Sequence, residues 1–277
     1  MKKNLLIVGI LVCALASSAQ AQIFDAGHLL GPGAPPPMIG VELGLGNHMQ
    51  SGTFEASCGC EFASGKGSGF LGGLLFELPI DYEWTIGLGA KLDFKTTTSS
   101  TTVLDTATVT FNNTSQVASG SFRFERDGSV KETFLTLAPF LRYELGRNGP
   151  FIQAGPGIGF LIGSDFTHKR VITQNSIVLT YIDGSGTFTV DNVRFQNGTK
   201  EETLQTGKIV SAGSTRISAI VTAGWNLSLS DNAVIAPMIS YDLALSGVRP
   251  DAAGPDGSTG WKLSTLYFSV GLKYKLD

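Results

Sequence analysis

The residue types that most often carry out catalysis are sparse in this sequence. The chain has three histidines, His28, His48 and His168, and none lies at a metal-ligand spacing from another. Asp165, Thr167 and His168 combine the residue types of a site that hydrolyses lipid, but the same residues are ordinary in polar loops. We favour the loop interpretation. The sequence therefore predicts no catalytic residue, no cofactor and no enzyme activity.

Two cysteines, Cys58 and Cys60, are the other candidates for reactive side chains. One residue separates them, so on a strand their side chains would share a face. An oxidising compartment would allow a small strained disulfide between them, and zinc binding together with His48 is the weaker alternative. We therefore treat Cys58 and Cys60 as a candidate disulfide pair and predict no metal site.

The N-terminus predicts export from the cytoplasm. Two lysines precede an apolar run over residues 5–16, and Ala19-Gln20-Ala21 is a small-x-small cleavage site, so residues 1–21 are predicted to be a cleaved signal peptide. Residues 22–37 contain the run GPGAPPP, which is typical of an extended tether. The formal net charge of −3 is too mild to suggest binding to nucleic acid.

The rest of the chain, residues 38–277, alternates between apolar and polar side chains. Near the C-terminus the even positions from Leu266 to Leu276 are all apolar, whereas the odd positions are mostly polar. Successive side chains of a strand point to opposite faces, so this segment has one apolar face that protein or lipid must cover. Pro139, Pro156 and Pro237 fall inside such segments and predict local bulges. Eight segments share the pattern: 38–46, 67–78, 84–95, 132–145, 150–162, 215–228, 233–248 and 261–277.

The connections between these segments are alternately long and short, as in a barrel with one rim in the periplasm and the other outside the cell. The longest cover residues 47–66, 96–130 and 163–213. Weak strand patterns within 96–130 suggest a hairpin that extends the flanking strands, and Asp183–Gly186 suggests a second hairpin. We therefore predict an all-β fold, a closed antiparallel up-and-down eight-stranded transmembrane β-barrel with short periplasmic turns and long extracellular loops.

Alternation alone does not say which face meets lipid, because a secreted lipocalin-like barrel has the same period with an apolar pocket inside. Three features favour lipid outside: apolar faces of about ten residues, aromatic residues near their ends, and charges of both signs on the opposite face. The charged face predicts a polar network that fills a narrow interior. Its predicted members are Glu42, Glu77, Lys91, Asp93, Arg142, Glu144, Arg216, Asp242 and Lys273.

The architecture resembles the eight-stranded bacterial outer-membrane β-barrel family, of the type built like the transmembrane part of OmpA and OmpX. The resemblance covers the signal peptide and about residues 38–277, and its most specific part is the closing segment SVGLKYKL. This segment is similar to the polar-x-Gly-x-x-aromatic-x-hydrophobic signal that such barrels present to their insertion machinery. The resemblance implies that Gly271, Tyr274 and Leu276 form an insertion signal, with the barrel-insertion machinery and the outer-membrane bilayer as partners.

Together these features predict a non-enzymatic barrel of the cell outer membrane with a side-chain-filled interior. The long loops are its predicted contact surfaces, and its role would be in envelope integrity or in binding an unidentified surface partner. Two alternatives remain open, a narrow passive channel for small solutes and a soluble lipocalin-like binding barrel. A third, a lipid-modifying enzyme, would depend on His168.

Overall fold

A computed structural model describes most of the chain from Pro35 onward. The described residues are 35–52, 54–55, 61–62, 64–110, 117–146, 149–181, 184–195, 198–208, 215–247 and 261–276. The predicted signal peptide, most of the predicted tether and both cysteines of the candidate disulfide lie outside them. The described part of the chain contains no helix with the length and apolar character needed to cross a bilayer.

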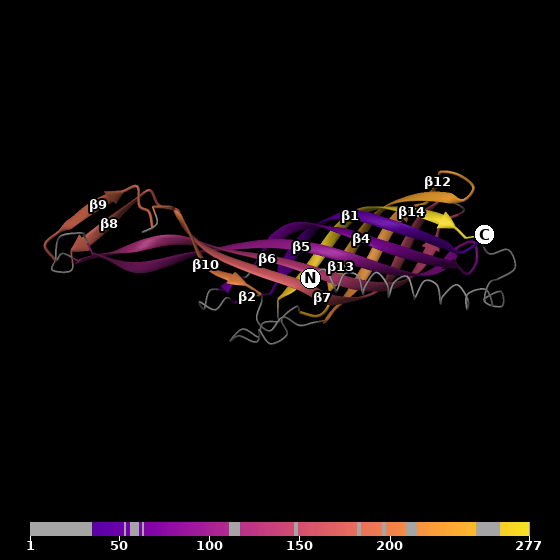
Figure 1. The fold of residues 1–277 in the computed structure, drawn as a ribbon, viewed down its shortest axis with the longest axis horizontal. Coiled ribbons are helices and arrows are strands. Elements are labelled where there is room, and N and C mark those ends of the chain that lie inside the picture. Colours follow the sequence, from indigo (N-terminus) through magenta and orange to yellow (C-terminus); the bar gives the residue numbers. More distant parts are fainter. Residues whose placement is uncertain are drawn as a thin grey trace, which may run out of the picture.

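Eight antiparallel strands form a closed ring (Figure 1). The strands are β1 (Met38–Ser51), β4 (Lys66–Pro79), β5 (Trp84–Thr110), β6 (Val117–Glu144), β7 (Pro150–Ile172), β11 (Thr215–Trp225), β13 (Ala233–Ala244) and β14 (Lys262–Lys275). Each of these strands pairs with the next one along the chain, β7 pairs with both β6 and β11, and the last strand pairs with the first. The predicted all-β, up-and-down, eight-stranded architecture is confirmed.

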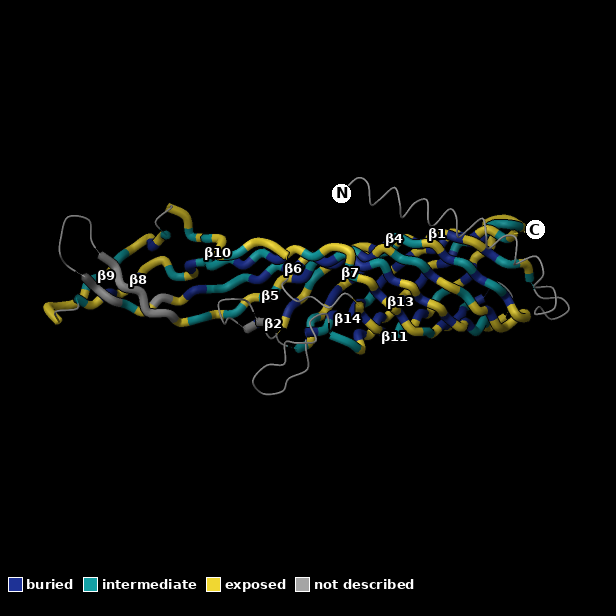
Figure 2. Tube along the Cα trace, turned by 60° about the horizontal axis from the view of Figure 1, so that its bottom comes forward, coloured by how far each residue is buried: buried dark blue, intermediate teal, exposed yellow. Residues whose placement is uncertain are grey.

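Buried and exposed residues alternate along the strands of the barrel (Figure 2). Many of the exposed residues are large and apolar. On β14, Phe268 and Leu272 are about half exposed, whereas Ser269 and Lys273 are buried. Leu88 on β5 points outward in the same way. An apolar wall of this kind is suited to hydrocarbon and unsuited to water. It is the reverse of the apolar-inside arrangement of a lipocalin-like barrel, so that alternative is wrong.

The rim that carries the short turns also carries the C-terminus (Figure 1). In the turn from β4 to β5, Asp81 Oδ1 accepts hydrogen bonds from the backbone N–H groups of Glu83 and Trp84, both at 2.7 Å. In the turn from β6 to β7, Gly146 has a φ of +90°, which a glycine adopts without strain. The third turn joins β12 (Leu227–Ser228), which pairs with β13, to β13 itself. Local turn chemistry therefore reverses the chain within a few residues at this rim.

At the opposite rim several strands continue beyond the ring, and we call this extension the stalk (Figure 1). β5 pairs with β4 as far as Thr98 and then continues beside β6 to Thr110. The stalk consists of residues 99–110 of β5, 117–131 of β6 and 166–172 of β7, with β8 (Ser176–Tyr181), β9 (Thr187–Asp191) and β10 (Glu201–Gly207).

Much of the sequence predicted as long loops is therefore strand. Within residues 96–130 the flanking strands extend as a hairpin, as the weak patterns suggested. Within 163–213, β8 pairs with β9 in the second predicted hairpin, β8 also pairs with β6, and β10 pairs with β7. Two short strands from the first long connection, β2 (Phe54–Glu55) and β3 (Glu61–Phe62), pair with each other.

The prolines interrupt the hydrogen-bond ladder without shifting its register, which corrects the bulges predicted at them. β6 and β7 lose their pairing over three positions and resume it in the same register, so Pro139 lies directly opposite Pro156. Neither proline has an N–H to donate, so the ladder has a gap there and the alternation of faces continues unbroken. Pro237 of β13 is paired with Val270 of β14. On its other side it lies in the gap between the β11 and β12 ladders, which have the same register. The register shift between β6 and β7 lies elsewhere, between Thr133 and Phe134.

Candidate functional site

The polar cluster that lies nearest the short turns of the barrel is centred on Glu77. Arg142 donates two hydrogen bonds to its carboxylate, at 2.7 and 2.6 Å, and the Lys273 ammonium lies 3.1 Å from it. Gln153 accepts a hydrogen bond from the same guanidinium at 2.9 Å, and Asn226 accepts one from Lys273 at 2.7 Å. Glu77, Arg142 and Lys273 are all buried. Their charges are therefore paired and hydrogen-bonded away from water, as buried charges must be.

Aromatic and acidic groups surround the same guanidinium. The Arg142 guanidinium carbon lies 4.3 Å from the ring centroid of Phe151 and 5.3 Å from that of Phe140. Glu144 lies 3.7 Å from Arg142 and accepts a hydrogen bond from Asn226 at 3.0 Å. The cation is thus held by both ion pairs and ring faces. Together these groups form the first ionic level of the interior.

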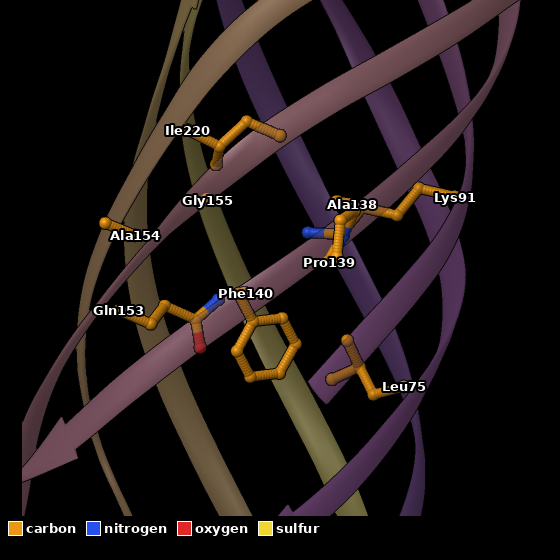
Figure 3. Close-up of a pocket in the computed structure, with 9 residues that line it drawn as sticks. All are labelled: Leu75, Lys91, Ala138, Pro139, Phe140, Gln153, Ala154, Gly155 and Ile220. Carbon is orange, nitrogen blue, oxygen red and sulfur yellow. The ribbon is translucent and has the colours of Figure 1, made fainter. Parts of the chain in front are cut away.

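A second ionic level lies at the middle of the barrel. Lys91 Nζ is 2.8 Å from one oxygen of Glu42, and the Ser269 hydroxyl donates to the other oxygen at 2.8 Å. Figure 3 shows Lys91, Gln153 and Phe140 around a cavity of about 10 Å³. A second cavity, of about 20 Å³, lies between Lys91 and the residues of the next level. Cavities of this size have room for roughly one or two water molecules.

A third ionic level lies nearer the stalk. Arg216 donates to Asp242 at 2.8 Å, and Lys95 pairs with Asp93 at 3.0 Å. The Tyr267 hydroxyl donates to the carboxylate of Asp93. These side chains come from β5, β11, β13 and β14, which lie on different sides of the ring. The level therefore joins opposite walls of the barrel.

Beyond the third level the interior becomes apolar, and one carboxylate, that of Glu132, lies near this boundary. Glu132 is buried opposite Lys95 in the ladder of β5 and β6, and neither of its oxygens has a hydrogen-bond partner among the described residues. Six buried apolar residues then pack together at the outer mouth, and we call them the apolar cap. They are Phe62, Val130, Phe134, Phe166, Trp261 and Leu263. The cap lies between the third ionic level and the stalk.

The structure places all nine residues of the predicted polar network on the inner side of the wall. Seven are buried, and the side chains of Lys91 and Glu144 are 12% and 13% exposed. Tyr267, Gln153 and Glu132 belong to the same interior but were not predicted. The sequence carried a signal for two of them, because side chains an even number of positions apart on one strand share a face. Tyr267 lies six positions from Lys273, and Glu132 lies ten positions from Arg142.

Asp165 and His168, two members of the trio that the hydrolytic alternative would need, do not converge. Asp165 is exposed, whereas His168 is buried with its ring 5.8 Å from that of Phe62 and 6.3 Å from that of Phe166. Burial lowers the pKa of the His168 imidazole. In the part of the chain that the structure describes, no three or more His, Cys, Asp and Glu side chains gather as metal ligands.

The residues of the predicted insertion signal lie on the closing strand and just beyond it. Gly271 faces the interior, while Tyr274 and Leu276 are exposed on the outer side near the C-terminal rim. The Leu276 N–H donates to the carbonyl of Pro37 at 2.7 Å, so the end of the chain is tied to the start of β1. Recognition of these residues by the insertion machinery stays a prediction.

The stalk has packing and ion pairs of its own. The rings of Phe124 and Phe195 stack with their centroids 6.1 Å apart, and the Arg170 guanidinium carbon lies beside both, 4.8 Å from each centroid. Arg170 also pairs with Glu202 at 2.7 Å. A buried apolar cluster continues from this point toward the tip. Its members are Phe124, Ile172, Ile177, Leu179 and Val193. The tip hairpin is therefore held by a small core, which a simple surface loop would not have.

Comparison with known proteins adds a family assignment. Residues 20–248 match the family described as outer membrane protein beta-barrel domain. Among solved structures the chain is similar to Ail of Yersinia pestis, with 10% identity, a TM-score of 0.33, and coverage of 86% of this chain and 99% of that one. The corresponding values are 13%, 0.37, 88% and 98% for OprG from Pseudomonas aeruginosa, and 10%, 0.33, 86% and 97% for Neisserial surface protein A. Comparison with curated proteins gives no significant match. The family match extends over most of the ring of strands described above, and the chain belongs to the outer membrane protein β-barrel domain family.

Proposed function

We propose that this protein is a non-enzymatic surface-interaction protein, in which the barrel is a membrane anchor and the stalk is the contact surface. The observation that carries the proposal is the length and order of the stalk. β5 continues through residues 99–110 beyond its last pair with β4. At about 3.3 Å per residue, these residues extend roughly 40 Å. The tip therefore stands clear of the lipid headgroups, where another surface can meet it.

The filled interior supports an anchor rather than a channel. Three ionic levels and the apolar cap occupy the barrel from one rim to the other, and the cavities lined by Lys91 measure about 10 and 20 Å³. A solute would have to separate buried ion pairs, and each broken pair costs about 3–5 kcal/mol. The side chains that fill the described part of the interior therefore favour a barrel that conducts no solute.

The geometry of β7 supports a role without catalysis. The lipid-modifying alternative needs Asp165 and His168 to act on one substrate. Asp165 is exposed, and His168 packs inside against the apolar cap. A base buried against aromatic rings on the other side of the sheet from its acidic neighbour has no route to a shared substrate.

Conductance in planar bilayers tests the closed interior. Purified refolded barrel should show no steady conductance under conditions in which an equal amount of a general porin gives clear steps. Steady openings of the wild-type protein would contradict the anchor proposal and favour the narrow passive channel.

Removal of most of the stalk tests the contact surface. We would delete residues 100–127 and 172–200 and close each gap with an Asn-Gly turn, because Ser99 lies opposite Gly128 and Val171 lies opposite Glu201. Heat-modifiable gel migration should show that the shortened barrel still folds in the outer membrane. We expect loss of cell adhesion and autoaggregation with unchanged entry of a large antibiotic. Normal adhesion with increased antibiotic entry would instead indicate a role in envelope integrity.

We also propose that the chain is exported with cleavage before Gln22 and inserted through its closing strand. N-terminal sequencing of the membrane form checks the cleavage. Tyr274→Ala should lower the amount of heat-modifiable barrel in the outer membrane. Tyr241→Ala is the matched control, because it removes an outward tyrosine from β13. Equal loss in both variants would argue against a specific signal.

A further inference from the structure

The three ionic levels differ in their balance of charge. The first has two cations and two carboxylates, and the second has one of each. Their members are Arg142, Lys273, Glu77 and Glu144 in the first level and Lys91 and Glu42 in the second. The third level has two cations, Lys95 and Arg216, and three carboxylates, those of Asp93, Asp242 and Glu132. Among the described residues, the third level therefore holds one carboxylate in excess of its cations.

Glu132 is the carboxylate that no cation contacts. It is 2% exposed, and neither of its oxygens accepts a hydrogen bond from a described residue. The two cations of the level are engaged elsewhere. Lys95 lies 3.0 Å from Asp93, and Arg216 donates to Asp242 at 2.8 Å. A buried carboxylate stays ionised only where hydrogen-bond donors or an opposite charge contact it. No described residue meets that need at Glu132.

The nearby histidine does not supply the missing positive charge. Lys95 donates to the hydroxyl oxygen of Thr265 at 2.9 Å, which leaves that hydroxyl placed to donate its own hydrogen to His48 Nδ1, 2.9 Å away. Nδ1 is then an acceptor, as it is in one tautomer of the neutral imidazole. An imidazolium would instead place a second cation beside the Lys95 ammonium. His48 is therefore neutral, and the excess negative charge remains to be balanced.

We propose that Glu132 binds a proton in the folded barrel and that release of this proton at raised pH loosens the apolar cap. A carboxylic acid carries no charge, so it removes the excess from the third level. Val130 and Phe134 lie two residues to either side of Glu132 on the same face of β6, and both belong to the cap. An ionised Glu132 needs water. Water that enters from the mouth must part these cap side chains.

The charges around Glu132 set the direction of the pH effect. The buried titratable groups on the surrounding strands are His48 of β1, Asp93 and Lys95 of β5, His168 of β7, Arg216 of β11, Asp242 of β13 and Tyr267 of β14. The carboxylates oppose ionisation of Glu132, and the two cations favour it. Glutamate in an unfolded chain is ionised at neutral pH, so folding takes up a proton. The free energy of unfolding therefore falls as the pH rises, until Glu132 ionises in the folded barrel.

Infrared spectroscopy of the refolded barrel detects the proton directly. At about pH 6 exposed glutamates are ionised, so the carbonyl stretch of a carboxylic acid marks a buried proton. Labelling glutamate with carbon-13 shifts that band and assigns it to this residue type. We expect the shifted band in the wild type and in Glu201→Gln, an exposed control on the stalk, and its loss in Glu132→Gln. No acid band in the wild type, or an equal band in Glu132→Gln, would overturn the proposal.

Tryptophan fluorescence tests the link to the cap. The chain has three tryptophans, and Trp84→Phe with Trp225→Phe leaves the buried Trp261 of the cap as the reporter. Quenching of Trp261 by acrylamide should rise about twofold or more between about pH 6 and about pH 9. Adding Glu132→Gln should remove the rise, and heat-modifiable migration at both pH values shows that each barrel stays folded. A rise that persists with Glu132→Gln would refute the link to the cap.

A bound monovalent cation is the other way to balance the charge of Glu132, and the same preparations distinguish it. With a cation the acid band is absent in the wild type. The urea midpoint of the wild type then rises in KCl relative to an equal concentration of choline chloride, and that of Glu132→Gln does not. This pair of results would replace the proton with a metal ion and overturn the proposal. A proton predicts equal midpoints in the two salts at about pH 6.

Discussion

Glu77→Gln tests whether the ionic levels stabilise the barrel or merely fill it. Glu77 accepts two hydrogen bonds from Arg142 and lies 3.1 Å from Lys273. Glutamine has nearly the same size and keeps one acceptor oxygen, so the substitution removes the charge without opening a cavity. Two buried cations then face a neutral amide. The loss is electrostatic, and the packing of the site is kept.

The expected effect is large. Removing one partner of a buried ion pair costs about 3–5 kcal/mol, because the remaining charge stays buried and unpaired. The matched control is Glu201→Gln, which breaks the stalk ion pair with Lys169. The side chains of that pair are 41% and 52% exposed. Solvent screens an exposed pair, so the control should cost less than about 1 kcal/mol.

Urea titrations in phospholipid vesicles, followed by tryptophan fluorescence, give the two free energies of unfolding. Heat-modifiable migration establishes that each variant reaches the folded barrel before the titration. Arg142→Gln in the Glu77→Gln background should cost less than Arg142→Gln alone, because the pair is already broken. A Glu77→Gln value within about 1 kcal/mol of the wild-type value would refute the reasoning, since it would make the buried pair no stronger than a surface pair.

Three further results are expected, each with its own measurement. Glu132→Gln should raise the urea midpoint of unfolding, because it removes a buried carboxylate whose oxygens have no hydrogen-bond partner among the described residues. A lower midpoint would mean that the surrounding groups compensate the charge of the carboxylate. Gly155→Ala should lower the free energy of unfolding by about 1–3 kcal/mol, because a Cβ there would lie 2.0 Å from the Pro139 carbonyl oxygen. Gly163→Ala is the control and should leave the free energy of unfolding unchanged, because the atom nearest to its Cβ would be 3.8 Å away. Burial lowers the pKa of His168, so the stability that the stalk owes to its neutral form is complete above about pH 6.5 and is lost as the pH falls toward the folded pKa. Hydrogen exchange of the β6 and β7 amides, corrected for intrinsic rates, should show this acid loss in the wild type, and its persistence in His168→Gln would assign it to another group.

The stalk shows where periodicity in the sequence stops being informative. Alternation marks a strand only when one face is buried and the other is not. Residues such as Thr101 and Ser129 are polar whichever way they point, so most of the segment 96–130 had the composition of a loop. The weak patterns at 108–111 and 121–124 were the only local sign of strand. Pairing of Ser99–Thr110 with β6 is a non-local fact that composition does not contain.

The prolines illustrate the same division. A proline has no backbone N–H, so the sequence identifies the strands in which one hydrogen bond of the ladder must be missing. Whether a strand responds with an extra residue or with a simple gap depends on its neighbour. Pro139 lies opposite Pro156, so both sides lack a donor and neither strand needs an additional residue. That register follows from ring closure and from the turn between β6 and β7.

The sequence by itself determined how many strands cross the wall, which face of each is apolar, and which charged residues share the other face. These are local properties, because side chains along one strand alternate with a period of two. The tertiary structure alone decided which charges meet. Glu77 finds Arg142 65 positions away and Lys273 196 positions away, and it does so because closing the ring brings the inner faces of β4, β6 and β14 around one narrow interior. Parity gives the direction of a side chain, and only the register and closure of the sheet give its partner.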